Sequence, residues 1–492
     1  NVNYFYKNII KNLNSKKIFI HSKKKKYNYI DIKKFYFSFC SKLKIFETNK
    51  KQLKICTLSK KSFFLYSSII SIILSRNIWV PIDEEMPLNI ISYIIKKSKV
   101  DLVLVDSRNE KLFSKFLNKI DVSYINIEKF NLRVAIKNQL NFKDYKEEDL
   151  AMIFFTSGST GYPKGVKMTN NNFISSLRGQ MRNIFSNINC KNLIFGDYHN
   201  TSFVISLNIL LPCLLLCSRI SPAKDPNDRI NPLPHIRENK VNCLITLPST
   251  IDRIKSFNNN FNNLKIRALL MCGEPFYIDN LYFIKDNIKP DQLFNCYGST
   301  ELSPWVFSYK FIVKDLNKIK KQGIVPIGKK FFNVKYKIVN DELRINGEMV
   351  NNYLDISQNS ANHLKKKQST WFLTKDKVKK IGKLIYVIGR SDSVVKLRGY
   401  RIELRGIESK IREFKDISNC FVFLSTDRNK KIFAAVETKN KKIRYDLEYF
   451  LSKNLQSYMI PKKIMFYTSF PKNKNGKTDR FKIKNKFKVK NL

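Results

Sequence analysis

The first 150 residues alternate between two kinds of hydrophobic pattern. Short apolar runs such as "KICTLS", "IWVPID" and "VDLVLVD" are separated by amphipathic stretches such as "PLNIISYIIKKSK". The short runs predict buried strands, and the amphipathic stretches predict helices that cover them. The rhythm continues in "VNCLITLPS", "IRALLMCGE" and "DQLFNCYGS", which end in polar or glycine-containing residues. This alternation predicts an α/β fold with largely parallel sheets, in which ligands bind where strands end in loops.

The pattern changes after about residue 330. The segments "NVKYKIVNDELRINGEMV" and "GKLIYVIGRSDSVVKLRGYRIEL" resemble β-hairpins rather than strands that alternate with helices. A smaller α+β unit is expected to follow "GRSD". We therefore predict a large N-terminal domain over residues 1–391, which holds the nucleotide and substrate, and a mobile C-terminal lid domain over residues 392–492.

Composition excludes several other classes of protein. The 492 residues carry a net charge of +51, which would usually favour nucleic acid or a membrane surface. The lysines are spread over the whole length instead of forming one basic arm, so we expect no nucleic-acid partner. Such a surface is still expected to attract acidic partners, including nucleotides or an acidic carrier protein.

Cysteine usage and the apolar runs favour a protein without zinc, disulfides or a membrane span. The nine cysteines form no CxxC pair, and only four histidines are available as further ligands. The runs "FFLYSSIISIIL" and "ILLPCLLLC" are shorter than the ~20 residues that cross a bilayer. Both are predicted to be core, and the N-terminus lacks an uninterrupted apolar signal region, so we expect a cytoplasmic protein.

One stretch, "FFTSGSTGYPKGVKMTN" from Phe154 to Asn170, combines hydroxyls, glycines and lysines. Glycines let backbone N–H groups approach a ligand, hydroxyls donate to its oxygens, and lysine supplies positive charge. The mixture suits a polyphosphate. A P-loop does not fit, because Gly158 is followed by Ser-Thr-Gly-Tyr and then Pro163. An ordinary surface turn is the remaining alternative for this stretch taken alone.

Four further motifs follow in a fixed order: "NCYGSTE" (295–301), "WFLTKD" (371–376), "GRSDSVVKLRGYRIEL" (389–404) and "PKNKNGKTDR" (471–480). With the opening stretch, they resemble the adenylate-forming superfamily over nearly the whole chain. This superfamily includes adenylation domains of nonribosomal peptide synthetases, D-alanine–carrier-protein ligases and acyl-CoA synthetases. The resemblance implies ATP and Mg²⁺ as cofactors, and a thiol acceptor that is the phosphopantetheine of a carrier protein or coenzyme A.

Phosphate chemistry assigns roles to the opening loop and to "YGSTE". Attack on the α-phosphate of ATP requires negative charge to be stabilised on both sides of one phosphorus. Tyr297 offers a flat face to adenine, Thr300 a hydroxyl to a phosphate oxygen, and Glu301 a carboxylate oxygen to Mg²⁺. The residues expected to surround the β- and γ-phosphates are Thr156, Ser157, Gly158, Ser159, Thr160, Gly161 and Lys164.

The later motifs take their roles from the resemblance. Asp376 is implied to accept hydrogen bonds from the ribose hydroxyls, with Arg390 assisting. Lys375 departs from the family, which usually has glycine there, and this is expected to affect local backbone geometry. Lys477 is implied to bridge the acid and the α-phosphate. Asp392 matches the hinge about which the C-terminal domain swings between two half-reactions.

The acid pocket gives two signals that disagree. Alignment with the family's Phe-Asp-x-Ser segment puts Val204 where amino-acid-activating members usually carry an aspartate for the substrate ammonium. A buried ammonium without a counter-charge is costly, which disfavours an ordinary α-amino acid. The "CGE" of Cys272, Gly273 and Glu274 resembles D-alanine ligases instead. His199 is a candidate gate of an acyl pocket, or a loop histidine without a specific function.

The first interpretation is an AMP-forming ligase that adenylates a small carboxylic or amino acid and passes it to a separate carrier protein. The alternative within the class is an acyl-CoA synthetase that uses free coenzyme A. A catalytically silent binding protein on the same fold is disfavoured, because Glu301, Asp376 and Lys477 are all present.

Overall fold

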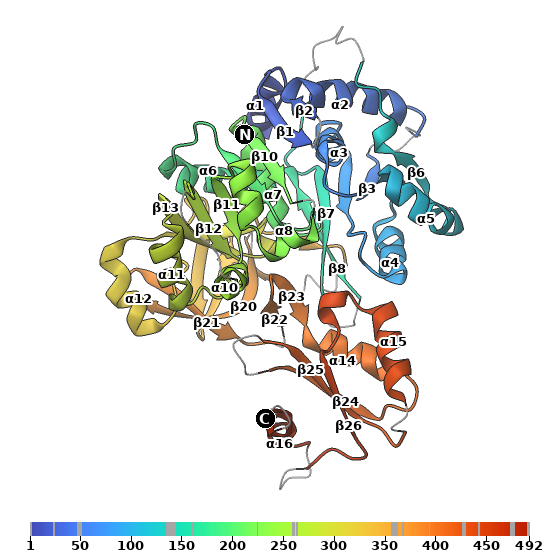
Figure 1. Cartoon of the computed structure of the whole chain (residues 1–492), viewed down its shortest axis with the longest axis vertical. Helices are drawn as coiled ribbons and strands as arrows, with labels where there is room; N and C mark the ends of the chain where they lie inside the picture. The colour runs from blue at the N-terminus through green and yellow to red at the C-terminus, as the bar shows by residue number, and fades with distance from the viewer. Residues whose placement is uncertain are drawn as a thin grey trace. The chain divides into compact units, whose positions relative to one another are not determined.

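The computed structural model describes residues 2–22, 25–46, 52–133, 144–158, 162–223, 225–257, 261, 264–355, 363–366, 369–392, 394–425, 430–440, 443–472 and 478–489. The chain forms two compact units (Figure 1). The large unit comprises Asn1–Glu84, Ile95–Phe155 and Gly165–Ser391. The small unit comprises Asp392–Leu492 together with the short segments Glu85–Ile94 and Thr156–Lys164. One unit boundary lies between Ser391 and Asp392, and the small unit also takes in two short segments from within residues 1–391. The expected division into two domains and the hinge at Asp392 stay predictions.

Two sheets of the large unit contain the parallel strands. The first sheet has the strand order β15 (Lys329–Lys330), β14 (Trp305–Lys310), β13 (Gln292–Gly298), β12 (Ala268–Cys272), β11 (Cys243–Thr246), β9 (Ile194–Asp197), β10 (Arg219–Pro222), β1 (Ile18–Ser22), β2 (Lys25–Asn28). The second has the order β18 (Asn352–Tyr353), β8 (Lys164–Thr169), β7 (Leu150–Thr156), β4 (Ile78–Pro81), β3 (Lys54–Leu58), β5 (Leu102–Val105), β6 (Ser123–Asn126). Strands β9 to β13 pair in parallel, as do β3, β4, β5 and β6. The predicted α/β fold with largely parallel sheets is confirmed.

A third sheet of the large unit is antiparallel. It contains β16 (Lys335–Val339), β17 (Glu342–Asn346), β20 (Ser369–Ile381) and β19 (His363–Lys366), with β21 (Leu384–Arg390) paired to β20. Of these strands, β16, β17 and β21 lie within the hairpin-like segments expected after residue 330, while β19 and β20 lie outside them. The smaller unit has a hairpin of β22 (Val394–Leu397) and β23 (Tyr400–Glu403), and a sheet of β24 (Asn419–Leu424), β25 (Ile432–Glu437) and β26 (Lys463–Tyr467).

Helices lie along both parallel sheets, for example α3 beside β3 (Figure 1). Their bounds in the first half of the chain are α1 Val2–Asn12, α2 Tyr29–Leu43, α3 Phe63–Leu74, α4 Leu88–Ser98, α5 Ser107–Lys119, α6 Asn170–Asn183, α7 Ile205–Leu215, α8 Pro226–Ile230 and α9 Leu233–Asn239. The later helices are α10 Pro248–Ser256, α11 Ile278–Phe283, α12 Leu316–Gln322, α14 Leu404–Arg412, α15 Arg444–Asn454 and α16 Arg480–Val489.

The two longest apolar runs of the sequence are buried helices. The run from Phe63 forms α3, and its start is capped by Ser62, whose side chain accepts a hydrogen bond from the backbone N–H of Leu65. The run from Ile209 lies in α7 as far as Leu215, and the residues of α7 from Ser206 to Leu214 are all buried. Helices that are apolar on every side are core elements. In the described part of the chain, no helix is long and apolar enough to cross a membrane.

A buried ion pair joins the start of α3 to the end of β9. The Nζ of Lys61 lies 2.8 Å from Oδ1 of Asp197, and the two side chains are only 5% and 2% exposed. The hydroxyl of Tyr66 donates to Oδ2 of the same carboxylate over 2.5 Å. Burial lowers the pKa of the Lys61 ammonium, and the Asp197 carboxylate opposes that shift. Each charge is therefore tolerated in the core because the other is present.

Lys61→Met should lower the free energy of unfolding by about 3–5 kcal/mol, because it leaves the Asp197 carboxylate buried without its cation. Urea denaturation of both proteins measures the difference. Arg444→Met is the matched control, since Arg444 pairs with Glu448 at 3.7 Å where both side chains are 47% exposed. The control should lose about 0–1 kcal/mol. Equal losses of unfolding free energy in the two variants would show that the buried pair stabilises the protein no more than the exposed pair does.

Candidate functional site

Four neighbouring strands of the first sheet end at the same edge. Because β9, β11, β12 and β13 pair in parallel, their carboxyl ends lie side by side. Local contacts link these ends. His199 Nε2 lies 2.9 Å from the carbonyl oxygen of Ile245 on β11. The Cys272 thiol donates a hydrogen bond to the carbonyl oxygen of Thr246 on the same strand, over 3.7 Å. Cys272 is also the register partner of Cys296 on β13. The edge therefore brings together candidate residues that lie far apart in sequence.

At the end of β13 the structure unites three predicted site residues. The Tyr297 hydroxyl donates to Oδ2 of Asp376 over 2.5 Å, and Arg390 Nη1 donates to Oδ1 over 2.6 Å. Strands β20 and β21 hold Asp376 opposite Arg390 in register. The Asp376 and Arg390 side chains are only 7% and 13% exposed. Burial, and then the nearby Asp376 carboxylate, raises the pKa of Tyr297 well above its usual value, so its hydroxyl keeps its proton.

This arrangement leaves hydrogen-bonding capacity on the carboxylate. Each oxygen of an ionised carboxyl group has two lone pairs, so Oδ1 and Oδ2 of Asp376 can each accept a second donor beside Arg390 and Tyr297. The Tyr297 ring is 6% exposed. The sequence grouped Asp376 with Arg390, and it did not foresee that Tyr297 would hold the same carboxylate. The ribose and adenine roles of these residues stay predictions.

Lys375 adopts the backbone conformation that glycine would favour. Its φ is +62°, in the left-handed region. The conformation is fixed on both sides: the Asp376 N–H donates to Thr374 Oγ1 over 3.1 Å, and the Ser391 N–H donates to the Lys375 carbonyl over 2.9 Å. The departure from the family glycine therefore leaves the Asp376 carboxylate in position, at the cost of a strained lysine.

Thr300 and Glu301 lie in a 3₁₀ turn, Thr300–Leu302, immediately after β13. Glu301 is 1% exposed, and Oε1 accepts a hydrogen bond of 2.7 Å from the Tyr353 hydroxyl. Asn351 donates its backbone N–H to the Glu301 carbonyl over 2.9 Å and its side-chain Nδ2 to the Thr300 carbonyl over 2.7 Å. Sequence reasoning missed both of these supporting residues, Tyr353 and Asn351.

The opening loop lies between β7 and β8. Thr156 ends β7 and Lys164 begins β8, while Ser159, Thr160 and Gly161 lie outside the described residues. The Ser157 hydroxyl donates to the backbone carbonyl of Arg401, another residue of the small unit. A Cβ added at Gly158 would collide with the carbonyl oxygen of Tyr162, so only glycine fits there. Gly158 is thus required by a close contact within the loop itself, and its role toward a phosphate stays a prediction.

The remaining predicted residues are placed as follows. Val204 is the N-cap of α7 and packs against the main apolar core. Cys272 is 1% exposed, and Gly273 after it has a φ of +79°. The Asp392 carboxylate Oδ1 accepts a hydrogen bond of 3.3 Å from the Val394 N–H. Lys477 lies outside the described residues.

His199 is held as a neutral imidazole. Because a carbonyl only accepts, the contact with Ile245 puts the ring proton on Nε2. Burial lowers the pKa of His199 to about 4, against the opposing effects of that carbonyl and of Asp197. The Nδ1 atom is then the unprotonated nitrogen, which makes His199 a hydrogen-bond acceptor toward its surroundings near neutral pH.

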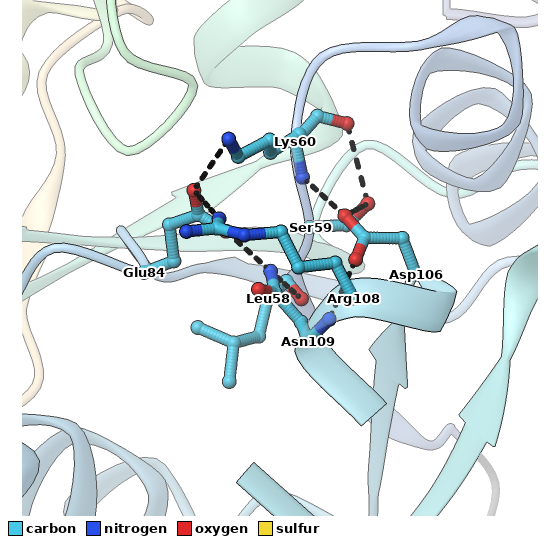
Figure 2. A network of polar contacts seen from close by, with 7 residues as sticks. All are labelled: Leu58, Ser59, Lys60, Glu84, Asp106, Arg108 and Asn109. Atoms are coloured by element: carbon cyan, nitrogen blue, oxygen red, sulfur yellow. Dashed lines mark hydrogen bonds and ion pairs between the residues drawn. The ribbon is translucent and has the colours of Figure 1, made fainter. Parts of the chain in front are cut away.

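At the ends of β3 and β5 in the second sheet, polar groups bond to one another (Figure 2). Asp106, at the end of β5, accepts hydrogen bonds from the backbone N–H of Asn109 and of Lys60, each over 2.8 Å. Glu84 accepts from Arg108 Nη1 over 2.9 Å and from the side-chain amide of Asn109 over 2.5 Å. Both carboxylates are thus engaged in joining β3, β5 and α5. In this sheet, β7 is the strand that leads into the opening loop predicted to bind phosphate.

Two sheets with parallel strands, a cluster of candidate ligand-binding side chains at strand ends and a small α+β unit are typical of nucleotide-binding α/β enzymes. The family model described as "AMP-binding enzyme" matches residues 11–351, and the chain belongs to this family. The predicted membership of the adenylate-forming superfamily is confirmed.

Individual relatives are distant. Gramicidin S synthase 2 of Aneurinibacillus migulanus is 28% identical over 454 residues, covering 87% of this chain and 10% of the synthase. This chain therefore spans about a tenth of that relative's length. A D-alanine–D-alanyl carrier protein ligase of Lactococcus lactis subsp. lactis (strain IL1403) is 26% identical, covering 88% of this chain and 89% of the ligase. The solved Vibrio cholerae adenylation domain AlmE, in complex with glycyl-adenosine-5'-phosphate, has a TM-score of 0.83 at 17% identity, covering 99% and 98% of the two chains. This likeness establishes the fold.

Lys375→Gly should raise the free energy of unfolding by about 0.5–1 kcal/mol, because glycine adopts a positive φ without the steric cost that lysine bears. Chemical denaturation measures the change. The control Lys377→Gly, two positions along β20, should be destabilised by a similar amount, since glycine weakens a strand interior. Destabilisation by Lys375→Gly would mean that the 4.0 Å ion pair of Lys375 with Glu342 outweighs the backbone strain.

Proposed function

We propose that this chain is an ATP-dependent, AMP-forming ligase that activates a small carboxylic or amino acid and transfers it to a thiol. The observation that carries the proposal is the buried Tyr297–Asp376–Arg390 cluster beside the Thr300–Glu301 turn, in a chain of the AMP-binding family. The cluster offers a carboxylate with spare acceptor capacity, which suits ribose hydroxyls.

The first half-reaction is an in-line displacement at phosphorus. A carboxylate oxygen of the acid attacks the α-phosphorus of ATP, and the bond to the bridging oxygen of pyrophosphate breaks, so an acyl-adenylate and pyrophosphate form. In this proposal, the Thr300 hydroxyl donates to a phosphate oxygen while the opening loop with Lys164 surrounds the β- and γ-phosphates. Lys477 contacts the attacking carboxylate and the α-phosphate, where negative charge accumulates.

Glu301 is the proposed protein ligand of Mg²⁺. It is a buried carboxylate, and carboxylate oxygens are hard ligands that Mg²⁺ accepts together with substrate phosphates and water. The described residues contain no group of three or more histidine, cysteine, aspartate or glutamate side chains that would hold a metal by themselves. A single carboxylate therefore fits a metal that arrives with the nucleotide. When bound, Mg²⁺ would neutralise phosphate charge, and the Tyr353 hydroxyl keeps Glu301 oriented.

The second half-reaction takes place at the acyl carbon of the adenylate instead of at phosphorus. A thiolate attacks the acyl carbonyl, the bond to the AMP oxygen breaks, and a thioester and AMP form. One arrangement cannot present Lys477 to the α-phosphate and also admit a thiol to the carbonyl, so we propose that the C-terminal domain rotates at Asp392 between the two steps. We further propose that the segment "KLRGYRIEL" (396–404) lines the channel by which the thiol enters. Its Gly399 has a left-handed φ of +80°, which allows a close backbone approach.

The proposed acceptor is the phosphopantetheine of a separate carrier protein. The D-alanine–D-alanyl carrier protein ligase, which matches this chain over most of both lengths, supports this choice. Free coenzyme A is the second candidate, because it presents the same thiol arm. Thioester formation with each acceptor in parallel assays distinguishes the two.

Lys477→Ala should slow adenylate formation about 10²–10³-fold, the usual loss when one preorganised charge-stabilising donor is removed. Acid-dependent exchange of labelled pyrophosphate into ATP measures this step, and Lys474→Ala in the same segment is the control. Normal exchange in Lys477→Ala would contradict the role of Lys477. Release of ADP instead of AMP by the wild type would contradict the proposed function as a whole.

Asp392→Pro should retain pyrophosphate exchange but lose most thioester formation, because proline fixes φ at the proposed hinge. Asp392→Ala, which leaves the backbone free to rotate, should support both steps. The ratio of the two half-reaction rates is the readout. A proportional loss of both rates in Asp392→Pro would point to damaged folding instead of a blocked rotation.

A further inference from the structure

Arg178, Arg182 and Phe332 form a cationic patch on the surface of the large unit, here named the arginine patch. The two arginines are four positions apart in α6, so they lie on one face of the helix. Their Cζ atoms lie 5.7 and 4.8 Å from the centre of the Phe332 ring. Both arginines are exposed, and Phe332 is 41% exposed. Cations at these distances are attracted to the ring face, so both guanidinium groups are held in place at the surface.

The residues on either side of Phe332 anchor it to α6. Phe331 is 0% exposed, and a Cβ added at Gly179 of α6 would collide with its ring. The Asn333 Nδ2 donates to the carbonyl oxygen of Ser175 over 2.9 Å and to its hydroxyl oxygen over 2.6 Å. The helix and the segment that carries Phe332 therefore form one rigid surface, which presents the two arginines in a fixed arrangement.

No acidic side chain from the same segments balances this charge. Residues 170–196, which include α6, and residues 324–340, which include the anchored ring, contain no aspartate or glutamate. Among the described residues, neither arginine of the patch forms an ion pair. Lys329 and Lys330 of the edge strand β15 are exposed and lie close to the ring in sequence, so they add further positive charge. The patch is thus available to an anionic partner.

The high lysine content of the chain does not explain this patch. Of the 91 lysine and arginine residues, only 19 are arginine. Lysine would supply the same charge, but it lacks the planar fork that binds a carboxylate through two parallel hydrogen bonds and stacks on an aromatic ring. Two exposed arginines against one ring therefore indicate recognition of a partner and not only solubility.

We propose that the arginine patch docks an acidic helix of a partner protein, with two carboxylates of that helix paired to Arg178 and Arg182. Residues four positions apart are about 6 Å apart along a helix axis, so carboxylates with the same spacing on a partner helix match the two arginines. Each guanidinium group then binds one carboxylate through its fork. None of the patch residues belongs to the candidate adenylation site, so this interaction is additional to the proposed function.

Two other classes of anionic partner fit the patch less well. Proteins that bind single-stranded nucleic acid offer aromatic rings on which bases stack, whereas the Phe332 ring is already in contact with both guanidinium groups. A helix that lies on a bilayer inserts a free apolar face. The apolar face of α6 is buried in the core, including Phe173, Ile174 and Leu177.

A charge-conserving variant tests the docking surface. The probe is a fluorescently labelled, alanine-rich helical peptide of about 20 residues with glutamates four positions apart, and anisotropy measures its Kd at about 0.15 M salt. The double variant Arg178→Lys/Arg182→Lys should bind the peptide about tenfold more weakly than the wild type, although its net charge is unchanged. Both changes are at exposed side chains, so the melting temperature and acid-dependent pyrophosphate exchange should stay as in the wild type.

The matched control removes charge elsewhere. Lys111 and Lys115 are exposed and four positions apart on α5, and Lys111→Gln/Lys115→Gln should leave the Kd of the peptide nearly unchanged. Failure of the wild type to bind the peptide would overturn the inference. Equal affinity of the wild type and the arginine-to-lysine variant would overturn it too, since general charge attraction would then account for binding. Tighter, arginine-dependent binding of a DNA oligonucleotide or of phosphatidylserine vesicles would overturn the assignment to a protein partner.

Discussion

Parallel pairing of β9, β11, β12 and β13 is the constraint on which the candidate site depends. Backbone hydrogen bonds fix the register of these strands, so their carboxyl ends meet at one edge whatever side chains they carry. The edge places the loop with His199, the thiol of Cys272 and the ring of Tyr297 in sequence along the sheet. Chemistry that needs an acid, a nucleotide and a metal in one place can then draw each contact from a different strand.

Asp376 extends this arrangement beyond the parallel sheet. It comes from the antiparallel sheet, yet its carboxylate is held by Tyr297 of the parallel sheet and by Arg390 of its own hairpin. The bond from Tyr297 spans 79 positions in sequence. Two sheets of the large unit are therefore tied together at a single carboxylate, and its position depends on the register of both.

The sequence predicted the features that local patterns encode. Alternating strands and helices indicated the parallel sheets, and the motif order indicated Tyr297, Asp376 and Arg390 as site residues. It did not predict the Lys61–Asp197 pair, because nothing near either residue marks a partner 136 positions away. Long-range pairing is a property of the packed core alone.

The Lys61–Asp197 pair also has a consequence for how the protein should respond to salt. A net charge of +51 makes surface repulsion oppose the compact state, and this repulsion is screened over a Debye length of about 8 Å at physiological ionic strength. The pair in the core is enclosed by protein, so dissolved ions scarcely weaken it. Added salt thus relieves the unfavourable electrostatics while sparing this favourable contact, which makes ionic strength a stabilising influence on this chain.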